Sequence, residues 1–230
     1  MKSLVYIVCL LCAAHLLPAQ DKPPELVSFS YRCLGLGREF RHMELYVGAG
    51  EGVARQQIYL NDLAKTNSYE YRGLPVLSFY AKATGGLPVA QARYNPEHDF
   101  PLLLFTKNPE GSATPCRVLP IEDSWQAHGV GTYKLVNLSS KALFWKVGAE
   151  RFKIESNDLR VIEVDGTSAK TPVIALEVNE DGKPSRVYRA KWHNLKNMRR
   201  LIFVRDTHEN EVGSVRVQVI EDFLVPQVTE

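Results

Sequence analysis

The chain has 230 residues, of which 45% are hydrophobic and 23% are charged, and its formal net charge is +2. So small a net charge gives no sign of nucleic acid or a membrane surface as a dedicated partner. The length allows two domains, each large enough to bury its own core.

The first 20 residues have the pattern of a secretion signal. A short positive start is followed by an apolar run over Leu4–Leu17, and Ala19 is a small residue suited to signal peptidase. The run is too short for a membrane span of about 20 residues. We therefore expect cleavage after Ala19 and export to the periplasm or the exterior, without a membrane span. A lipoprotein is the disfavoured alternative, because no small residue directly precedes Cys12.

Short segments rich in β-branched and aromatic residues follow, separated by glycine, proline or Asn-Asp pairs. In residues 21–123 the predicted strands are 27–31, 44–47, 57–60, 76–80, 88–94, 101–105 and 117–121. In residues 124–230 they are 132–137, 143–147, 151–154, 159–164, 173–178, 186–192, 201–204 and 214–220. This density of strands, in about 100 residues each time, is typical of an immunoglobulin-like sandwich.

The second half of the chain repeats the first. Three blocks recur in the same order, at shifts of 99, 100 and 98 residues: Cys116–Asp123 as Val215–Asp222, Val47–Gly50 as Val147–Glu150, and Leu102–Phe105 as Arg200–Phe203. The glycine-containing turns at Gly85–Pro88 and Asp181–Pro184 also occupy matching places. The sequence therefore predicts an all-β protein with two tandem immunoglobulin-like β-sandwich domains, 21–123 and 124–230, related by internal duplication.

Two cysteines, Cys33 and Cys116, remain after removal of the signal segment. In an oxidising compartment such a pair is more often a disulfide than a metal or redox site. The pair falls in the first and last predicted strands of the first repeat, and these strands often run close together in sandwiches. We expect a Cys33–Cys116 disulfide, with two buried free thiols as the alternative.

Signatures of catalysis and of metal binding are missing from the sequence. The histidines form no His-x-His or His-Glu-x-x-His pattern, and neither a Gly-x-Ser-x-Gly elbow nor a phosphate-binding loop is present. We expect no cofactor. The acidic pairs Glu122–Asp123 and Glu221–Asp222 recur in both repeats. We interpret them as groups that cap and solubilise strand ends, although carboxylates converging from distant strands stay possible.

A basic stretch near the end of the second repeat is the candidate binding surface. Along Arg186–His193, alternation places Tyr188, Ala190 and Trp192 on one face and the cations on the other. The candidate residues for contact with an anionic polymer or a partner protein are Arg186, Arg189, Lys191, Lys196, Arg199 and Arg200. The favoured interpretation is plainer: Trp192 belongs to the core and the cations form a solvated face.

Several segments of the second repeat carry a resemblance. The segments are Gly131–Ser139, Val187–Trp192, Arg200–Val204 and Val215–Asp222. Together they resemble a family of uncharacterised exported bacterial proteins built from tandem β-sandwiches. The resemblance covers most of residues 125–223. It implies the same fold and export, and it implies no activity or binding site.

Export, tandem sandwiches and missing catalytic signatures together favour a non-catalytic binding or structural module of the cell envelope. An envelope protein is the first choice of partner and a glycan the second. The alternative is an envelope hydrolase acting on glycan or peptide, whose reactive groups meet only in three dimensions. Flat faces and an open edge strand would favour binding, and a cleft holding two carboxylates with perturbed pKa values would favour hydrolysis.

Overall fold

The computed structural model describes residues 25–48, 54–164, 169–179, 181–207 and 211–224. The expected signal segment, residues 1–20 with cleavage after Ala19, lies outside this part of the chain. The described residues fold into β-strands joined by turns and loops, with a single short 3-10 helix, η2, at Arg38–Phe40.

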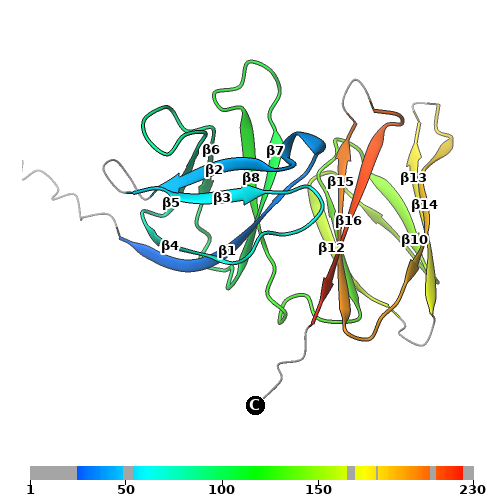
Figure 1. The fold of residues 1–230 in the computed structure, drawn as a ribbon. Coiled ribbons are helices and arrows are strands. Elements are labelled where there is room, and N and C mark those ends of the chain that lie inside the picture. Colours follow the sequence, from blue (N-terminus) through cyan, green and yellow to red (C-terminus); the bar gives the residue numbers. More distant parts are fainter. Residues whose placement is uncertain (1–24, 49–53, 165–168, 180, 208–210, 225–230) are drawn as a thin grey trace, which may run out of the picture.

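Each repeat consists of two four-stranded sheets (Figure 1). In the first repeat one sheet has the order β4 (Tyr69–Gly73), β1 (Val27–Gly35), β7 (Pro101–Lys107), β8 (Cys116–Glu122), and the other has the order β3 (Gln56–Leu60), β2 (Met43–Gly48), β5 (Val76–Tyr80), β6 (Ala90–Arg93). In the second repeat the orders are β12 (Asp158–Glu163), β9 (Thr132–Asn137), β15 (Met198–Asp206), β16 (Val215–Phe223), and β11 (Glu150–Ile154), β10 (Leu143–Val147), β13 (Lys170–Val178), β14 (Pro184–His193).

The two repeats have the same topology strand for strand. In both, the first strand pairs in parallel with the seventh, β1 with β7 and β9 with β15, while the other pairings are antiparallel. Strands β5 and β13, at Val76–Tyr80 and Lys170–Val178, occupy the same place in their sheets. The fold is therefore that of two tandem β-sandwich domains related by internal duplication, as the sequence predicts.

The sheet register corrects one of the sequence shifts. Leu103 and Phe105 of β7 face the core of the first sandwich, and their counterparts in the second core are Ile202 and Val204 of β15. This correspondence requires a shift of 99 residues, not the predicted 98. The difference matters because a slip of one residue moves every side chain of a strand to the opposite face of the sheet.

Three apolar clusters hold the molecule together. One fills each sandwich, and the third lies between the repeats, where residues of β1, β7 and β8 pack against residues of β9, β15 and β16. Strand β7 is buried over Pro101–Phe105 without alternation, as expected for a strand covered on both faces. The repeats therefore lie side by side with their inner sheets in contact, and β10, β13 and β14 form the far end of the molecule (Figure 1).

The expected disulfide is not formed, and the sheet register explains why. Cys33 pairs with Leu103 of β7, whereas Cys116 pairs with Lys107 of the same strand. The cysteines are therefore two strands apart, about 10 Å, and offset by four residues along β7, about 13 Å. A disulfide requires Cα atoms within about 7 Å. Both thiols are free and buried, which was the alternative interpretation.

Candidate functional site

The outer sheet of the second repeat, β11-β10-β13-β14, presents one face to solvent. Alternation decides which side chains face outward, because Trp145 of β10, Phe152 of β11 and Val173 of β13 are buried in the sandwich core. Trp192 of β14 is also buried there, as the plainer interpretation of the basic stretch predicts. The residues between these buried positions form the outer face.

An apolar stripe runs through the middle of this face. Phe144 of β10 is 41% exposed and lies opposite the half-buried Leu176 of β13. Ile174 is half-buried and Pro172 is exposed on the same strand and the same side. Apolar side chains that lie next to one another on a solvent-facing sheet, with polar groups around them, make this stripe a candidate contact surface.

Cations flank the stripe on both sides. Across the sheet, Arg151 of β11 lies opposite Lys146 of β10, which lies opposite Ile174, which lies opposite Arg189 of β14. A second row places Lys153 beside Phe144, with Leu176 and then Arg186 beyond it. A third places Lys191 opposite Pro172. We call the residues of these rows the basic face: Lys146, Arg151, Lys153, Arg186, Arg189 and Lys191 around Phe144, Pro172, Ile174 and Leu176.

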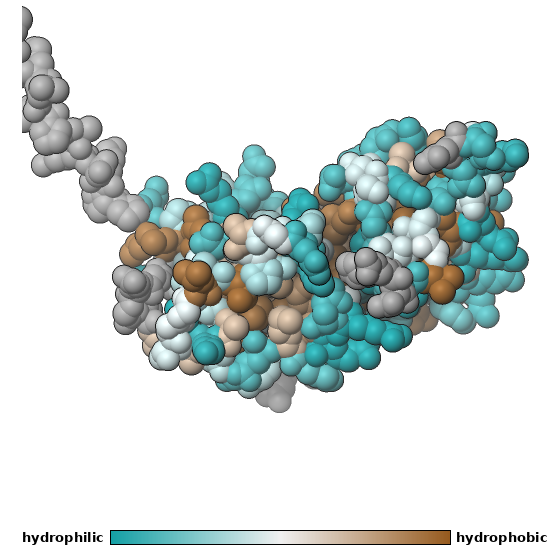
Figure 2. All heavy atoms as spheres, turned by 90° about the horizontal axis from the view of Figure 1, so that it is seen from above, coloured by the Kyte–Doolittle hydropathy of each residue, from teal (hydrophilic) through white to brown (hydrophobic). Residues whose placement is uncertain are grey.

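The charges of the basic face are largely uncompensated. Lys153 binds Glu155 at 2.7 Å and lies 5.8 Å from the ring of Phe144. The other five cations form no ion pair with a described residue, and no outward position within the rows is acidic. Figure 2 shows hydrophilic residues covering most of this end of the molecule. The face therefore has a positive field around a partly apolar centre.

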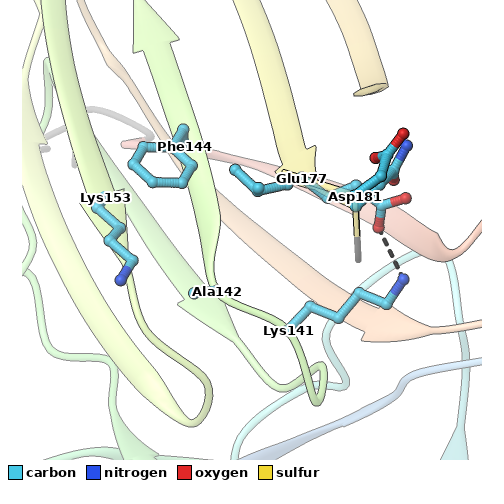
Figure 3. Close-up of a pocket in the computed structure, with 8 residues that line it drawn as sticks. Lys141, Ala142, Phe144, Lys153, Glu177 and Asp181 are labelled. Atoms are coloured by element: carbon cyan, nitrogen blue, oxygen red, sulfur yellow. Dashed lines mark hydrogen bonds and ion pairs between the residues drawn. The ribbon is translucent and has the colours of Figure 1, made fainter. Parts of the chain in front are cut away.

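Two hollows open on this face. One, of about 430 Å³, lies over Phe144, Ile174 and Leu176 and is bordered by cations of the first two rows. The other, of about 860 Å³, lies at the end of the stripe, where Phe144 and Lys153 stand beside Lys141 (Figure 3). Both are open, so the face suits an extended or polymeric ligand better than an enclosed small molecule.

Glu177 lies at the border of the larger hollow, and its negative charge is compensated by neighbouring groups. It accepts hydrogen bonds from Lys141 Nζ at 2.9 Å and from Ser214 Oγ at 2.6 Å. Burial favours the neutral form of Glu177, but these hydrogen bonds and the charge of Lys141 outweigh it and hold its pKa below the usual range. The lysine and the carboxylate are therefore an ion pair at the rim, as the dashed line in Figure 3 marks.

The structure divides the residues predicted as the binding surface. Arg186, Arg189 and Lys191 are exposed on the basic face, and Lys196 is exposed in the loop after β14. The prediction that Arg199 and Arg200 lie on the surface was wrong. Each is 1% exposed, because both lie at the start of β15, in a sheet covered on both faces.

Both arginines are buried in hydrogen-bond networks. Arg199 binds Asp222 Oδ2 at 2.8 Å, donates to the backbone carbonyls of Ser124 and His128, and lies 3.9 Å from the ring of Trp125. Arg200 binds Glu221 at 2.6 Å and donates to Tyr133 Oη at 2.7 Å. Two of the predicted binding residues are thus structural.

Sequence reasoning missed the other half of the basic face. Lys146, Arg151 and Lys153 were assigned to strands but not to a site. The alternation of apolar and basic residues along 143–147 and 151–154 resembles that along 186–193. Strand pairing across β13 is what brings the two basic stripes onto one face, and a single sequence does not show which strands are neighbours.

The recurring acidic pairs divide into two kinds. Glu122 accepts hydrogen bonds from the backbone amides of Phe100 and Ser124, as predicted for a group that caps a strand end, but the prediction was wrong for the two aspartates. Asp123 and Asp222 meet between the repeats at Lys65, whose ammonium is 2.8 Å from Asp123 and also binds Asp222. Burial favours the neutral form of Asp222, but hydrogen bonds and charges from Lys65 and Arg199 outweigh it and lower its pKa. This is the behaviour of a structural ion-pair network, since a catalytic acid needs a raised pKa.

His128 belongs to the same buried region. Burial, together with the charges of Arg199 and Lys134, lowers its pKa to about 3. The imidazole is therefore neutral at physiological pH. Among the described residues no three metal-ligating side chains lie close enough together to hold a metal ion.

Comparison with known proteins does not assign this chain to a family. No protein-family model matches this chain, and none of the curated proteins matches its sequence. The resemblance to exported tandem β-sandwich proteins therefore stays a prediction. Within the described residues, no helix is long and apolar enough to cross a membrane.

Proposed function

We propose that this protein is a non-catalytic exported binding module of the cell envelope, and that it binds an acidic protein through the basic face. The observation that carries the proposal is the arrangement of six cations around an apolar stripe, of which Lys153 alone forms an ion pair with a described residue. Charge complementarity of this kind steers association and excludes partners of the same sign.

The apolar stripe favours a protein over a purely polar polymer. A protein interface needs an apolar centre that loses water on binding, with polar or charged residues at its rim. Phe144, Ile174 and Leu176 supply such a centre, and the rows of cations supply the rim. An anionic glycan remains the second candidate, because Phe144 offers an exposed ring on which a sugar could stack.

The hydrolase alternative gains no support from the acidic residues. The carboxylates that recur in sequence, Asp123 and Asp222, are bound by Lys65 and Arg199 between the repeats. The lowered pKa of Asp222 favours its charged form, which is opposite to what a general acid requires.

The test is capture from envelope extract with the mature protein and two charge-matched variants. Arg151→Glu with Arg189→Glu reverses two cations on opposite sides of the apolar stripe. Arg72→Glu with Arg93→Glu makes the same change of charge at exposed positions of the first repeat. Wild type and the control variant should retain the same acidic protein, and the basic-face variant should retain at least tenfold less.

Two outcomes would overturn the proposal. One is equal retention by both variants, which would place binding elsewhere. The other is retention of no protein by the wild type. Retention of an anionic glycan that depends on Arg151 and Arg189 would replace the protein partner by the second candidate.

A further inference from the structure

We propose that strand β14 accepts an extended acidic segment of the partner as an added β-strand, so that the segment continues the sheet β11-β10-β13-β14. The inference rests on the proposed function and specifies how the partner binds. It uses the free edge of β14 for backbone hydrogen bonds and the basic face for recognition of side chains.

The edge of β14 is open among the described residues. Its ten residues, Pro184–His193, pair only with β13. The equivalent strand of the first repeat, β6, has four residues, and its end is closed by a hydrogen bond from Cys116 N of β8 to Val89 O. In the second repeat no backbone hydrogen bond between described residues joins β16 to β14. A long unpaired edge is the feature that strand addition requires.

The backbone directions along β14 follow from its pairing. Gly148 N donates to Pro172 O, so the backbone carbonyl of Pro172 points toward β10 and away from β14. Lys191 lies opposite Pro172, and its own N–H and C=O therefore point away from β13, toward the free edge. The same holds at Arg189 and His193, which lie two residues to either side of Lys191; the register shifts between Ala175 and Leu176 of β13, beyond Arg189.

These edge residues are also the ones whose side chains lie on the basic face. Arg189 and Lys191 are exposed on the outer side, while Ala190 and Trp192 between them face the core. In an antiparallel addition, a residue hydrogen-bonded to Lys191 places its side chain on the same side as that of Lys191, with Cα atoms about 5.5 Å apart. A segment with acidic residues at every second position would thus pair with these cations while its backbone extends the sheet.

A second copy of this chain is a poor occupant of the edge. Two β14 strands paired with each other would place cations opposite cations, which destabilises the pair. Charged edges also protect natural sheets from indiscriminate pairing. If protection were the whole role of Arg189 and Lys191, an acidic strand would find no site there, and this outcome is part of the test.

The probe is a capped nine-residue peptide of alternating threonine and glutamate, added to the full mature protein. Hydrogen exchange of individual amides is followed by NMR. At saturating peptide, exchange of the Arg189 and Lys191 amides should slow at least tenfold. The amides of Ala190 and Trp192 are already bonded to β13 and should change little. A peptide with lysine in place of glutamate should have no effect.

Backbone methylation provides a matched control within the peptide. In the proposed register the glutamate amides face β14 and the threonine amides face away. Methylating the glutamate nitrogens should weaken binding at least tenfold, whereas methylating the threonine nitrogens should leave it within about threefold. Arg189→Glu with Lys191→Glu should abolish binding, while Arg72→Glu with Arg93→Glu should not.

The outcomes separate the two proposals. Peptide binding without slowed exchange at Arg189 and Lys191 would overturn strand addition and leave the basic face as a binding surface. Retention of the envelope partner together with no binding of the acidic peptide would also overturn strand addition alone. Loss of both would overturn the proposed function as well.

Discussion

The outer sheets of the two repeats have the same topology, but their solvent-facing sides carry different residues. In the second repeat the row Arg151, Lys146, Ile174 crosses the sheet, and the same places in the first repeat hold Gln57, Tyr46 and Tyr80. These three positions of the first face carry no charged residue, and Gln57 Nε2 donates to Tyr46 Oη at 3.5 Å. The cation nearby, Arg55, is stacked on Tyr80, with its guanidinium carbon 3.3 Å from the centre of the ring. Duplication has kept the sheet and changed what it displays.

The inner sheets show the contrary behaviour. Where the repeats meet, equivalent positions carry similar residues: Leu34 and Val136, Leu102 and Leu201, Leu104 and Phe203, Ile121 and Ile220. Their side chains are constrained by close packing, whereas outward residues of the outer sheets meet only solvent. The comparison indicates that close packing constrains the inner sheets, and the divergence of the outer sheets supports the proposal that the second repeat binds through its outer face.

The largest effect is expected where the inner sheets meet. Phe203 is 1% exposed between the repeats, so Phe203→Ala should lower the free energy of unfolding by about 3–5 kcal/mol. Phe144→Ala on the basic face is the matched control and should cost less than about 1 kcal/mol, because the ring is partly solvated already. Urea denaturation measures both. Similar losses of unfolding free energy for the two variants would contradict the view that the inner sheets contribute more to stability than the outer face.

Asp222→Asn should cost about 2–3 kcal/mol at pH 7, because it leaves Lys65 and Arg199 short of a partner in a buried network. The folded pKa of Asp222 is lowered, so its contribution is complete above the usual aspartate pKa of about 4 and is lost as the pH falls further. The gap in stability between wild type and variant should therefore close below about pH 4. A gap independent of pH would contradict this assignment.

Exchanging outer residues between the repeats should change binding without changing stability. Lys146→Tyr with Arg151→Gln gives the second repeat the residues found at these places in the first. The free energy of unfolding should stay within about 0.5 kcal/mol, since both positions are exposed. Retention of the partner should fall at least tenfold. Unchanged retention would show that these cations do not distinguish the two faces.

The smallest effect is expected from a reductant. Cys33 and Cys116 occupy places that in the second repeat belong to Leu135 and Val215, and burial raises the pKa of both thiols. Reduction should leave the urea midpoint unchanged, and an alkylating agent should label both cysteines only after unfolding. A midpoint that falls on reduction would mean that a bond between them forms after all.

The sequence was sufficient for the fold because strand propensity, turns and duplication all agree. It was insufficient to determine which side chains of a fully apolar strand point into the sandwich core. The runs Leu102–Phe105 and Leu201–Val204 are apolar throughout, so no alternation fixes which residue points inward, and the predicted shift was wrong by one. The same continuity was a signal that these strands are covered on both faces.

The candidate site was only partly predictable for a related reason. Arg199 and Arg200 have the same charge as Arg189, and only the distant carboxylates of Asp222 and Glu221 make their burial possible. Local sequence identifies a cation, but its environment depends on strands that pair across the fold. This is why the basic stretch was predicted and its true extent was not.

The contact between the repeats has one further consequence. Both repeats contribute equivalent strands to it, so its apolar part has the composition of an interface between two copies of one subunit. A single repeat on its own would expose this apolar surface to water, and association with a second copy would cover it. Fusion of two such copies would have made the association independent of concentration, and it would have freed one subunit to change its outer sheet while the other remained as it was.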